Sequence, residues 1–264
     1  MTRAGLFVLL AALFAAWANG ALAQDKPRVI YVFVALADNQ HQGIIPVPAA
    51  LGNGDDPARN LYWGAAYGVR TFLRKSADWK EVFAAQNPYK GILQRSVFQH
   101  RTENVLLIAD AYRGSEIQQA VMDFLRAAAG VNLHQGEPAL CMVAGLLQCA
   151  PDYADLVVYA GHDGLMDFSL SPDFSARSGG SRQAIVLACV SKAYFASLLR
   201  ASGAEPLLWT TGLMAPEAYT LEAALRGWIL RESKEQIRRR AAAAYAKYQK
   251  CSENAALRLF STGW

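Results

Sequence analysis

The sequence predicts an α/β fold in which a mainly parallel β-sheet lies between two layers of helices, as a single-domain, three-layer α/β/α sandwich. Short apolar segments rich in β-branched residues alternate with segments whose apolar residues recur at helical spacing, an order typical of parallel sheets covered on both faces. The chain has 264 residues, of which 53% are hydrophobic and 18% are charged. It is therefore long and apolar enough to build a sizeable core.

The first 23 residues have the pattern of a secretory signal peptide. Arg3 gives a basic start, residues 6–17 form an apolar run, and Ala21-Leu22-Ala23 fits an A-x-A cleavage site. The run is shorter than the roughly 20 apolar residues that a membrane span needs. We therefore expect cleavage near Ala23 and export to the periplasm or the medium. Residues 24–264 then form the folded domain, which we expect to have no membrane attachment after cleavage.

Five apolar segments are predicted to be buried strands. They form continuous runs without polar alternation, which is typical of strands covered on both faces. The predicted strands are residues 28–36, 104–110, 156–159, 184–188 and 206–211, with an edge strand at 97–100. Helices are expected at 61–75, 78–85, 115–129, 192–201 and 216–226, followed by a C-terminal helical extension, one helix or a pair, from about residue 231.

Two of the predicted strands end in residues suited to nucleophilic catalysis. The strand at 156–159 leads to His162, and the strand at 184–188 leads to Cys189. If these strands are parallel and adjacent, the imidazole and the thiol meet at the carboxyl-terminal edge of the sheet, where open α/β sheets bind ligands. The alternative is structural: a lone cysteine in an apolar run is often a small buried hydrophobe.

A cysteine nucleophile needs a base, and the base needs a third group that orients it. Asn39 or Asp38, at the end of the first strand, is the candidate for that third group. Backbone amides near Asp163 and Gly164 are candidates for stabilising an oxyanion, since glycine beside the histidine lets substrate approach the backbone.

These two segments resemble the motifs of a known family. VVYAGHDG (157–164) and IVLACVSKAYF (185–195) resemble the histidine and cysteine motifs of the caspase-like cysteine peptidases, which include caspases, legumains, gingipains, separases and bacterial relatives. Those proteins carry histidine followed by glycine after one core strand and cysteine after the next. PLLWTTGLMAPEAYTLEAAL (206–225) is similar to the strand and helix that follow in bacterial separase-like members. The resemblance implies a caspase-like sheet, with Asn39 assisting the histidine as in legumain-like members.

The sequence thus predicts an exported, cysteine-dependent hydrolase: a caspase-like peptidase that cleaves a peptide or protein substrate with a Cys189–His162 dyad and no cofactor. One alternative is a catalytically inactive, caspase-like binding module of the cell envelope. It is raised by Asp163, which separates His162 from Gly164, and by residues 190–192, which stand where the family carries a glycine. The other is a metal-dependent hydrolase. Its ligands would come from Asp38, Asn39, His41, His162, Asp163 and Asp167.

Five further residues are candidate substrate contacts: His41, Asp55, Asp56, Tyr112 and Arg113. Tyr112 and Arg113 follow the strand at 104–110, where the guanidinium could pair with an acidic substrate group. Asp55 and Asp56 lie in a Gly-rich loop. They either cap the helix that follows or form a selectivity pocket for a basic side chain.

Charge and cysteine content set the remaining expectations. The formal net charge is +4, and removal of Arg3 leaves 25 basic against 22 acidic residues, or +3, which is too mild to predict nucleic-acid binding. In an exported protein Cys141, Cys149 and Cys251 could form disulfides. Cys141 and Cys149 are the natural local pair, although the sequence does not fix the connectivity.

Overall fold

The computed structural model describes residues 26–131, 133, 154–174, 180 and 182–264. The expected signal peptide lies outside the described residues, as do Cys141 and Cys149.

The described residues build one eight-stranded sheet with the order β2-β3-β4-β1-β5-β6-β7-β8. Its centre is parallel, because β4, β1, β5, β6 and β7 pair with their neighbours in the same direction. A β2–β3 hairpin extends one side and the short β8 closes the other, all by antiparallel pairing. The bounds are β1 Arg28–Ala35, β2 Trp79–Tyr89, β3 Ile92–His100, β4 Val105–Tyr112, β5 Ala154–Ala160, β6 Gln183–Leu187, β7 Glu205–Thr210 and β8 Phe260–Ser261.

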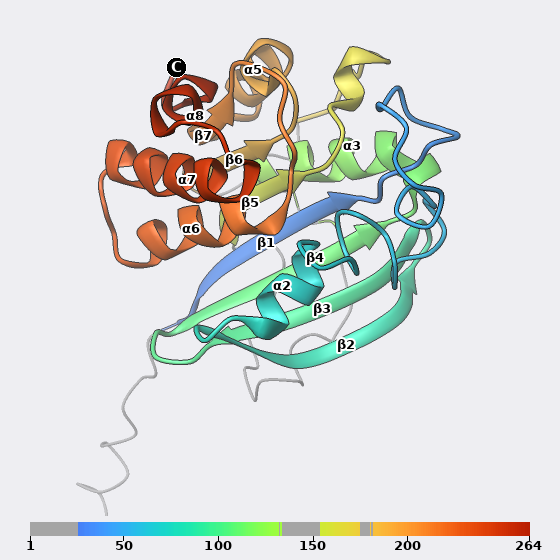
Figure 1. Cartoon of the computed structure of the whole chain (residues 1–264), viewed down its shortest axis with the longest axis horizontal. Coiled ribbons are helices and arrows are strands. Elements are labelled where there is room, and N and C mark those ends of the chain that lie inside the picture. The colour runs from blue at the N-terminus through green and yellow to red at the C-terminus, as the bar shows by residue number, and fades with distance from the viewer. Residues whose placement is uncertain (1–25, 132, 134–153, 175–179, 181) are drawn as a thin grey trace, which may run out of the picture.

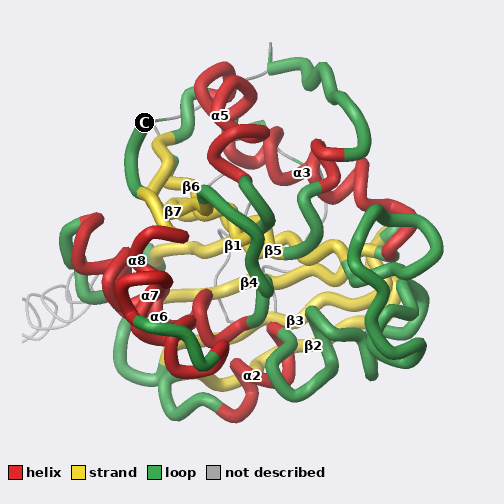
Figure 2. Tube along the Cα trace, turned by 45° about the horizontal axis from the view of Figure 1, so that its top comes forward, coloured by secondary structure: helices red, strands yellow, loops and turns green. Residues whose placement is uncertain are grey.

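Helices cover both faces of this sheet (Figures 1 and 2). The two faces have separate apolar cores, and β1 contributes alternate residues to each: Val32 and Val34 to one, Phe33 and Ala35 to the other. The first core contains α2 (Val69–Lys75), α6 (Ala218–Ile229), α7 (Lys234–Gln249) and α8 (Glu253–Leu259); the second contains α3 (Ile117–Ala128) and α5 (Ser191–Ser202). The predicted α/β fold is confirmed.

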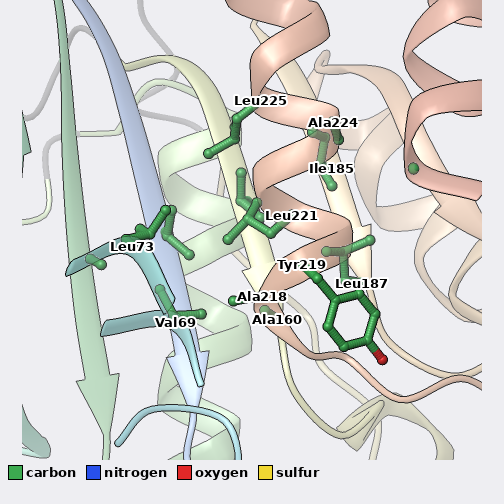
Figure 3. Close-up of a cluster of buried hydrophobic side chains, with 14 of the residues drawn as sticks. Val69, Leu73, Ala160, Ile185, Leu187, Ala218, Tyr219, Leu221, Ala224 and Leu225 are labelled. Atoms are coloured by element: carbon green, nitrogen blue, oxygen red, sulfur yellow. The ribbon is translucent and has the colours of Figure 1, made fainter. Parts of the chain in front are cut away.

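Helix α6 illustrates how sequence spacing becomes packing. Ala218, Leu221 and Leu225 lie at helical spacing, so they share one face. In Figure 3 this face lies over the sheet, with Ala218 beside Ala160 of β5. These four side chains are at most 1% exposed, so each of the two leucines contributes about 1.5–3 kcal/mol through burial.

Two sequence predictions on the hairpin side of the sheet are wrong. Residues 78–85 form no helix, since β2 begins at Trp79 and pairs with β3 along its length. Residues 97–100 are the end of β3, which lies between β2 and β4 and is therefore not an edge strand. Val82 and Phe83 in the misassigned segment favour a strand, and cross-strand pairing decides such short segments.

The helix expected at 61–75 is shorter than predicted. Only Val69–Lys75 is helical, and turns precede it. The buried side chain of Asn60 holds these turns: it donates to the carbonyls of Ala37 (2.8 Å) and Asn53 (3.0 Å), and it accepts from the amide of Tyr62 (3.1 Å). Tertiary hydrogen bonds therefore replace the first helical turns, and they tie the loop after β1 to the sheet.

A buried ion pair joins β3, β4 and β1. Arg95 donates Nε to Asp110 Oδ1 and Nη2 to Asp110 Oδ2, both at 2.6 Å. The hydroxyl of Tyr31 donates to Asp110 Oδ2 and accepts from Arg95 Nη2, both at 2.7 Å. The three residues are at most 1% exposed. Two-point geometry and a third partner offset the desolvation that such a pair costs.

Removal of one partner of this pair should destabilise the fold strongly. Asp110→Ala leaves the Arg95 charge buried, and we expect a loss of about 3–5 kcal/mol in the free energy of unfolding. The double variant Arg95→Met with Asp110→Leu should recover most of that loss. Urea unfolding measures both, and Arg239→Ala, which removes an exposed ion pair to Glu235, is the control and should cost less than about 1 kcal/mol. Equal losses for Asp110→Ala and Arg239→Ala would show that the buried Arg95–Asp110 pair matters no more to stability than an exposed ion pair.

Candidate functional site

The parallel pairing of β5 with β6 sets the level of the two candidate catalytic residues. Ala160 pairs with Leu187 at the carboxyl ends of these strands. His162 and Cys189 each follow that pair by two residues, so both leave the sheet at the same edge. The sequence-based expectation that the two strands are parallel and adjacent is therefore confirmed.

Cys189 sits on a sharp turn between β6 and α5. Val190, the next residue, has φ 49° and ψ 27°, and α5 begins at Ser191. A β-branched residue in the left-handed region is a strained conformation, which costs roughly 1–3 kcal/mol and persists only where its surroundings enforce it. The amide of Val190 donates to the carbonyl of Gly212 at 2.9 Å, which ties the turn to the loop after β7.

Ser191 and Thr210 hold this turn through a fully buried hydrogen-bond network. Ser191 Oγ donates to the carbonyl of Val186 (3.0 Å) and accepts from the amide of Thr210 (3.0 Å). Thr210 Oγ1 donates to the carbonyl of Ala188 and accepts from the amide of Ser191 (3.2 Å). Ser191 stands within the segment where the resembled family carries a glycine, and here it fixes the turn that presents Cys189.

The backbone around His162 is equally constrained. Gly161 has φ 155°, which side chains rarely adopt, and a Cβ there would lie 3.0 Å from the carbonyl oxygen of Ala35. Its amide donates to the carbonyl of Leu187 on β6 at 3.2 Å. The buried hydroxyl of Tyr159 donates to the carbonyl of His162 at 2.7 Å. The imidazole is only 8% exposed, so its orientation is set by the protein.

Asp167 is the partner of the imidazole. Its Oδ2 lies 2.7 Å from Nε2 of His162 and accepts from the amide of Gly43 at 3.1 Å. Asp167 directly follows a 3₁₀ turn at Gly164–Met166. A carboxylate on Nε2 fixes the proton there, which leaves Nδ1 as the nitrogen that can accept a proton. The site therefore contains the third group that a cysteine–histidine pair requires.

The thiol of Cys189 lies against the backbone of Met214. Sγ donates to its carbonyl at 3.5 Å and accepts from its amide at 3.4 Å. Burial raises the pKa of the Cys189 thiol; the Met214 amide opposes this, and the negative charge of Asp163 adds to it. The resting residue is therefore a protonated thiol at neutral pH, and it needs a base before it can act as a nucleophile.

His162 and Cys189 line the same cavity, which has a volume of about 430 Å³. Its remaining walls come from the loop after β1, the turns before α2, the loop after β7, and α7, and they include Ile44, Leu61, Tyr62, Leu213, Pro216 and Tyr245. A cavity of this size and apolar character falls within the range of small-ligand and side-chain binding pockets.

The residues expected to orient the imidazole are bonded elsewhere. In the side chain of Asn39, Nδ2 donates to the carbonyl of Val47 (2.8 Å) and Oδ1 accepts from the amide of Val47 (3.1 Å). Asp38 Oδ2 lies 2.9 Å from Nδ1 of His41. These residues stabilise their own loop and line a second cavity, of about 370 Å³. In this structure Asp167 has the orienting position that the sequence assigned to Asn39 or Asp38.

The two residues expected at an oxyanion site have structural partners. The amide of Gly164 donates to the carbonyl of His162 at 3.0 Å, and a Cβ at Gly164 would lie 2.5 Å from the ring of Phe168. Asp163 is fully buried, and its Oδ1 accepts from the amide of Leu165 at 3.1 Å. Its Oδ2 has no hydrogen-bond partner among the described residues.

Four of the candidate substrate contacts pair with protein groups. Tyr112 is buried and its hydroxyl donates to Asp123 at 3.0 Å, so it belongs to the core. Arg113 forms an exposed ion pair with Asp55 at 2.9 Å. Asp56 accepts from Arg59 at 2.6 Å and caps the following turn through the amide of Ala58. These residues, like His41, do not line the cavity that contains Cys189.

The metal hypothesis gains no support from the geometry. Within the part of the chain that the structure describes, no group of three or more His, Cys, Asp or Glu side chains could hold a metal ion. Cys189 and Cys251 are free thiols, and Cys251 is exposed.

Comparison of the chain with models of protein families, with curated proteins and with solved structures found no match. No helix in the described ranges is long and apolar enough to cross a membrane.

Sequence reasoning considered Asp167 only as a metal ligand. Its five-residue spacing from His162 carried no signal, because the path of the intervening turn decides whether the two side chains meet. The role of Thr210 and the contact with Met214 depend on the neighbouring strand β7, so the sequence around Cys189 could not reveal them.

The buried carboxyl of Asp163 should make stability depend on pH. Burial raises its pKa to about 7, with the nearby charge of Asp167 adding to the effect. The unfolded chain ionises near pH 3.9. The contribution of the Asp163 carboxyl to the free energy of unfolding is therefore fully present below about pH 4. It is lost as the pH rises to about 7, by at most about 1.4 kcal/mol for each pH unit.

Asp163→Asn, a neutral isostere, should remove this loss. We expect the variant to be more stable than the parent at pH 8, by about 1–3 kcal/mol, and similar to it at pH 4. Thermal unfolding across this range measures the difference, with the exposed Asp155 changed to Asn as the matched control. A constant offset at all pH values would show that Asp163 is ionised in the folded protein.

Proposed function

We propose that this chain is an exported cysteine-dependent hydrolase, a caspase-like peptidase in which Cys189 is the nucleophile, His162 is the base and acid, and Asp167 orients the imidazole. One observation carries the proposal: Cys189 and His162 line one cavity at the carboxyl ends of two adjacent parallel strands. The family assignment rests on the resemblance of the two motifs and on their order, histidine then cysteine, after neighbouring core strands. Export rests on the sequence of the first 23 residues.

The chemistry follows from the protonated thiol. As Sγ attacks a substrate carbonyl, Nδ1 of His162 takes the thiol proton, while Asp167 stabilises the imidazolium through Nε2. The S–C bond forms and the C–N bond breaks as the imidazolium gives its proton to the departing amine. A water molecule, activated by the same imidazole, then releases the acid and restores the thiol.

Two features of the site would stabilise negative charge during this cycle. The amide of Met214 points at Sγ, so it favours the thiolate as that forms. The 12-residue helix α5 begins two residues after Cys189, and its amino end carries a partial positive charge. Both effects act against the burial that raises the thiol pKa.

Loss of Cys189 should abolish hydrolysis, and loss of His162 should reduce it strongly. Cys189→Ala is expected to reduce turnover of an unfolded protein substrate, such as reduced casein, to background. His162→Ala should lower it by about 10²–10⁴-fold, because it removes the proton acceptor. Peptide release followed by mass spectrometry is the measurement, and Cys251→Ala, at the exposed free thiol, is the control that should retain full activity. Wild-type activity in Cys189→Ala would rule out this mechanism.

Asp167 acts through His162, so its variants should separate its effect on the orientation of the imidazole from the effect of its negative charge. Asp167→Ala frees the imidazole, and we expect kcat to fall by about tenfold or more. Asp167→Asn keeps an oxygen that can accept Nε2–H, so it should restore part of the rate. The split between kcat and KM is the second readout: kcat should fall without a rise in KM, because Asp167 contacts the imidazole and does not line the cavity. A rise in KM with kcat unchanged in both variants would contradict this role.

A caspase-like binding module without peptidase activity is the second candidate. It is favoured by the raised pKa of Cys189 and by the hydrogen bond that engages the Gly164 amide. The two candidates differ in the casein experiment, since a binding module gives no cleavage in wild type or in any variant.

A further inference from the structure

The cavity that contains Cys189 is lined mainly by apolar residues. Among the described residues that line it there is no Asp, Glu, Lys or Arg. Its polar groups are His162, the thiol of Cys189, and the hydroxyls of Tyr62 and Tyr245. Burial raises the pKa values of both tyrosines, so their hydroxyls are neutral at physiological pH. A charged side chain would lose its hydration here without meeting an opposite charge.

The rim of this cavity exposes large apolar side chains. Ile45 is 83% exposed, Leu213 is 68% exposed and Met166 is 42% exposed, and all three line the cavity. They come from three different loops, which follow β1, β7 and β5. Exposed apolar side chains gathered at one opening mark a binding site, whereas singly scattered ones need no explanation.

The two aspartates that the sequence suggested for a selectivity pocket form ion pairs outside this cavity. Asp55 pairs with Arg113, and Asp56 pairs with Arg59. Neither aspartate lines the cavity of Cys189. No carboxylate of the described residues lines the cavity, so its walls offer none to a basic side chain.

We infer that this cavity binds an uncharged, apolar side chain of a peptide substrate, of the size of leucine, methionine or phenylalanine, belonging to the residue whose carbonyl Cys189 attacks. The inference rests on the proposed function of the site. The cavity wall carries the nucleophile, so the side chain that fills the cavity belongs to a residue next to the scissile bond. Apolar burial then supplies the binding energy and the selectivity.

Binding to the inactive protein tests this inference without any catalytic step. Acetylated tetrapeptide amides Ala-Ala-Ala-X, with X as Leu, Phe, Asp, Asn or Lys, are titrated into Cys189→Ala by calorimetry. We expect saturable binding of the Leu and Phe peptides, at least about tenfold tighter than that of the Asp, Asn and Lys peptides. Equal affinities, tighter binding of a charged peptide, or no saturable binding of the Leu and Phe peptides would overturn the inference.

A charge placed on the rim tests the location. Met166→Glu in the Cys189→Ala background should weaken binding of the Leu peptide and strengthen binding of the Lys peptide, which moves their affinity ratio by about tenfold or more. Leu230→Glu is the matched control, because Leu230 is also an exposed apolar residue and does not line the cavity. If both variants change the ratio equally, the peptide does not bind at this cavity.

The catalytic role of Cys189 and the apolar selectivity of the cavity can be contradicted independently. If wild-type protein cleaves casein but its cleavage sites follow charged residues, the catalytic assignment stands and the apolar pocket is wrong. If the Leu and Phe peptides bind as expected but Cys189→Ala leaves casein cleavage unchanged, the apolar pocket stands and the catalytic assignment is wrong.

Discussion

The pairing of β5 with β6 is the constraint on which the candidate site depends. The register places Ala160 opposite Leu187, and each strand delivers one reactive residue two positions later. Three local features then fix the positions of these residues: the strained turn at Val190, the Ser191–Thr210 hydrogen-bond network and the unusual backbone conformation of Gly161. Each feature involves a contact with a neighbouring strand or loop. The geometry of the site therefore depends on contacts between several strands and loops.

The electrostatics of the site lead to a specific kind of mechanism. Burial raises the pKa of the thiol, so Cys189 does not store a thiolate in the resting protein. In the proposed mechanism His162, whose Nε2 lies against Asp167, takes the proton as the S–C bond forms. In the inference above, the same apolar surroundings that raise the thiol pKa disfavour charged substrate side chains in the cavity. The protonated resting thiol and the proposed selectivity thus have one physical origin, which is the low polarity of the walls around Sγ.

Sequence patterns predicted the parts of the fold that burial alone determines. The apolar runs of β1, β4, β5, β6 and β7 were recognisable because strands covered on both faces carry few polar residues. The hairpin strand β2 was not, since its exposed face gives it a mixed pattern that resembles a short helix. Likewise, the turns at 61–68 depend on Asn60 and its contacts with a distant loop.

The site was predictable to a similar extent. His162 and Cys189 follow apolar strands, so their position could be inferred from the chain itself. Asp167 and Met214 could not be assigned, because their roles arise from loop conformations and from a third strand. Asn39 and Asp38 were reasonable expectations at a strand end, but the structure uses their side chains within their own loop.

The most direct test of the central claim is the rate of alkylation of Cys189 by iodoacetamide against pH, in wild type and in His162→Ala, with each modified residue identified by peptide mass. Cys251 is the internal reference, because it is a free and exposed thiol. If His162 accepts the thiol proton, the alkylation rate of Cys189 at pH 7, taken relative to that of Cys251, falls about tenfold or more in His162→Ala. If Cys189 reacts only at alkaline pH and at the same rate in both proteins, the thiol is a buried structural residue and the catalytic account is wrong.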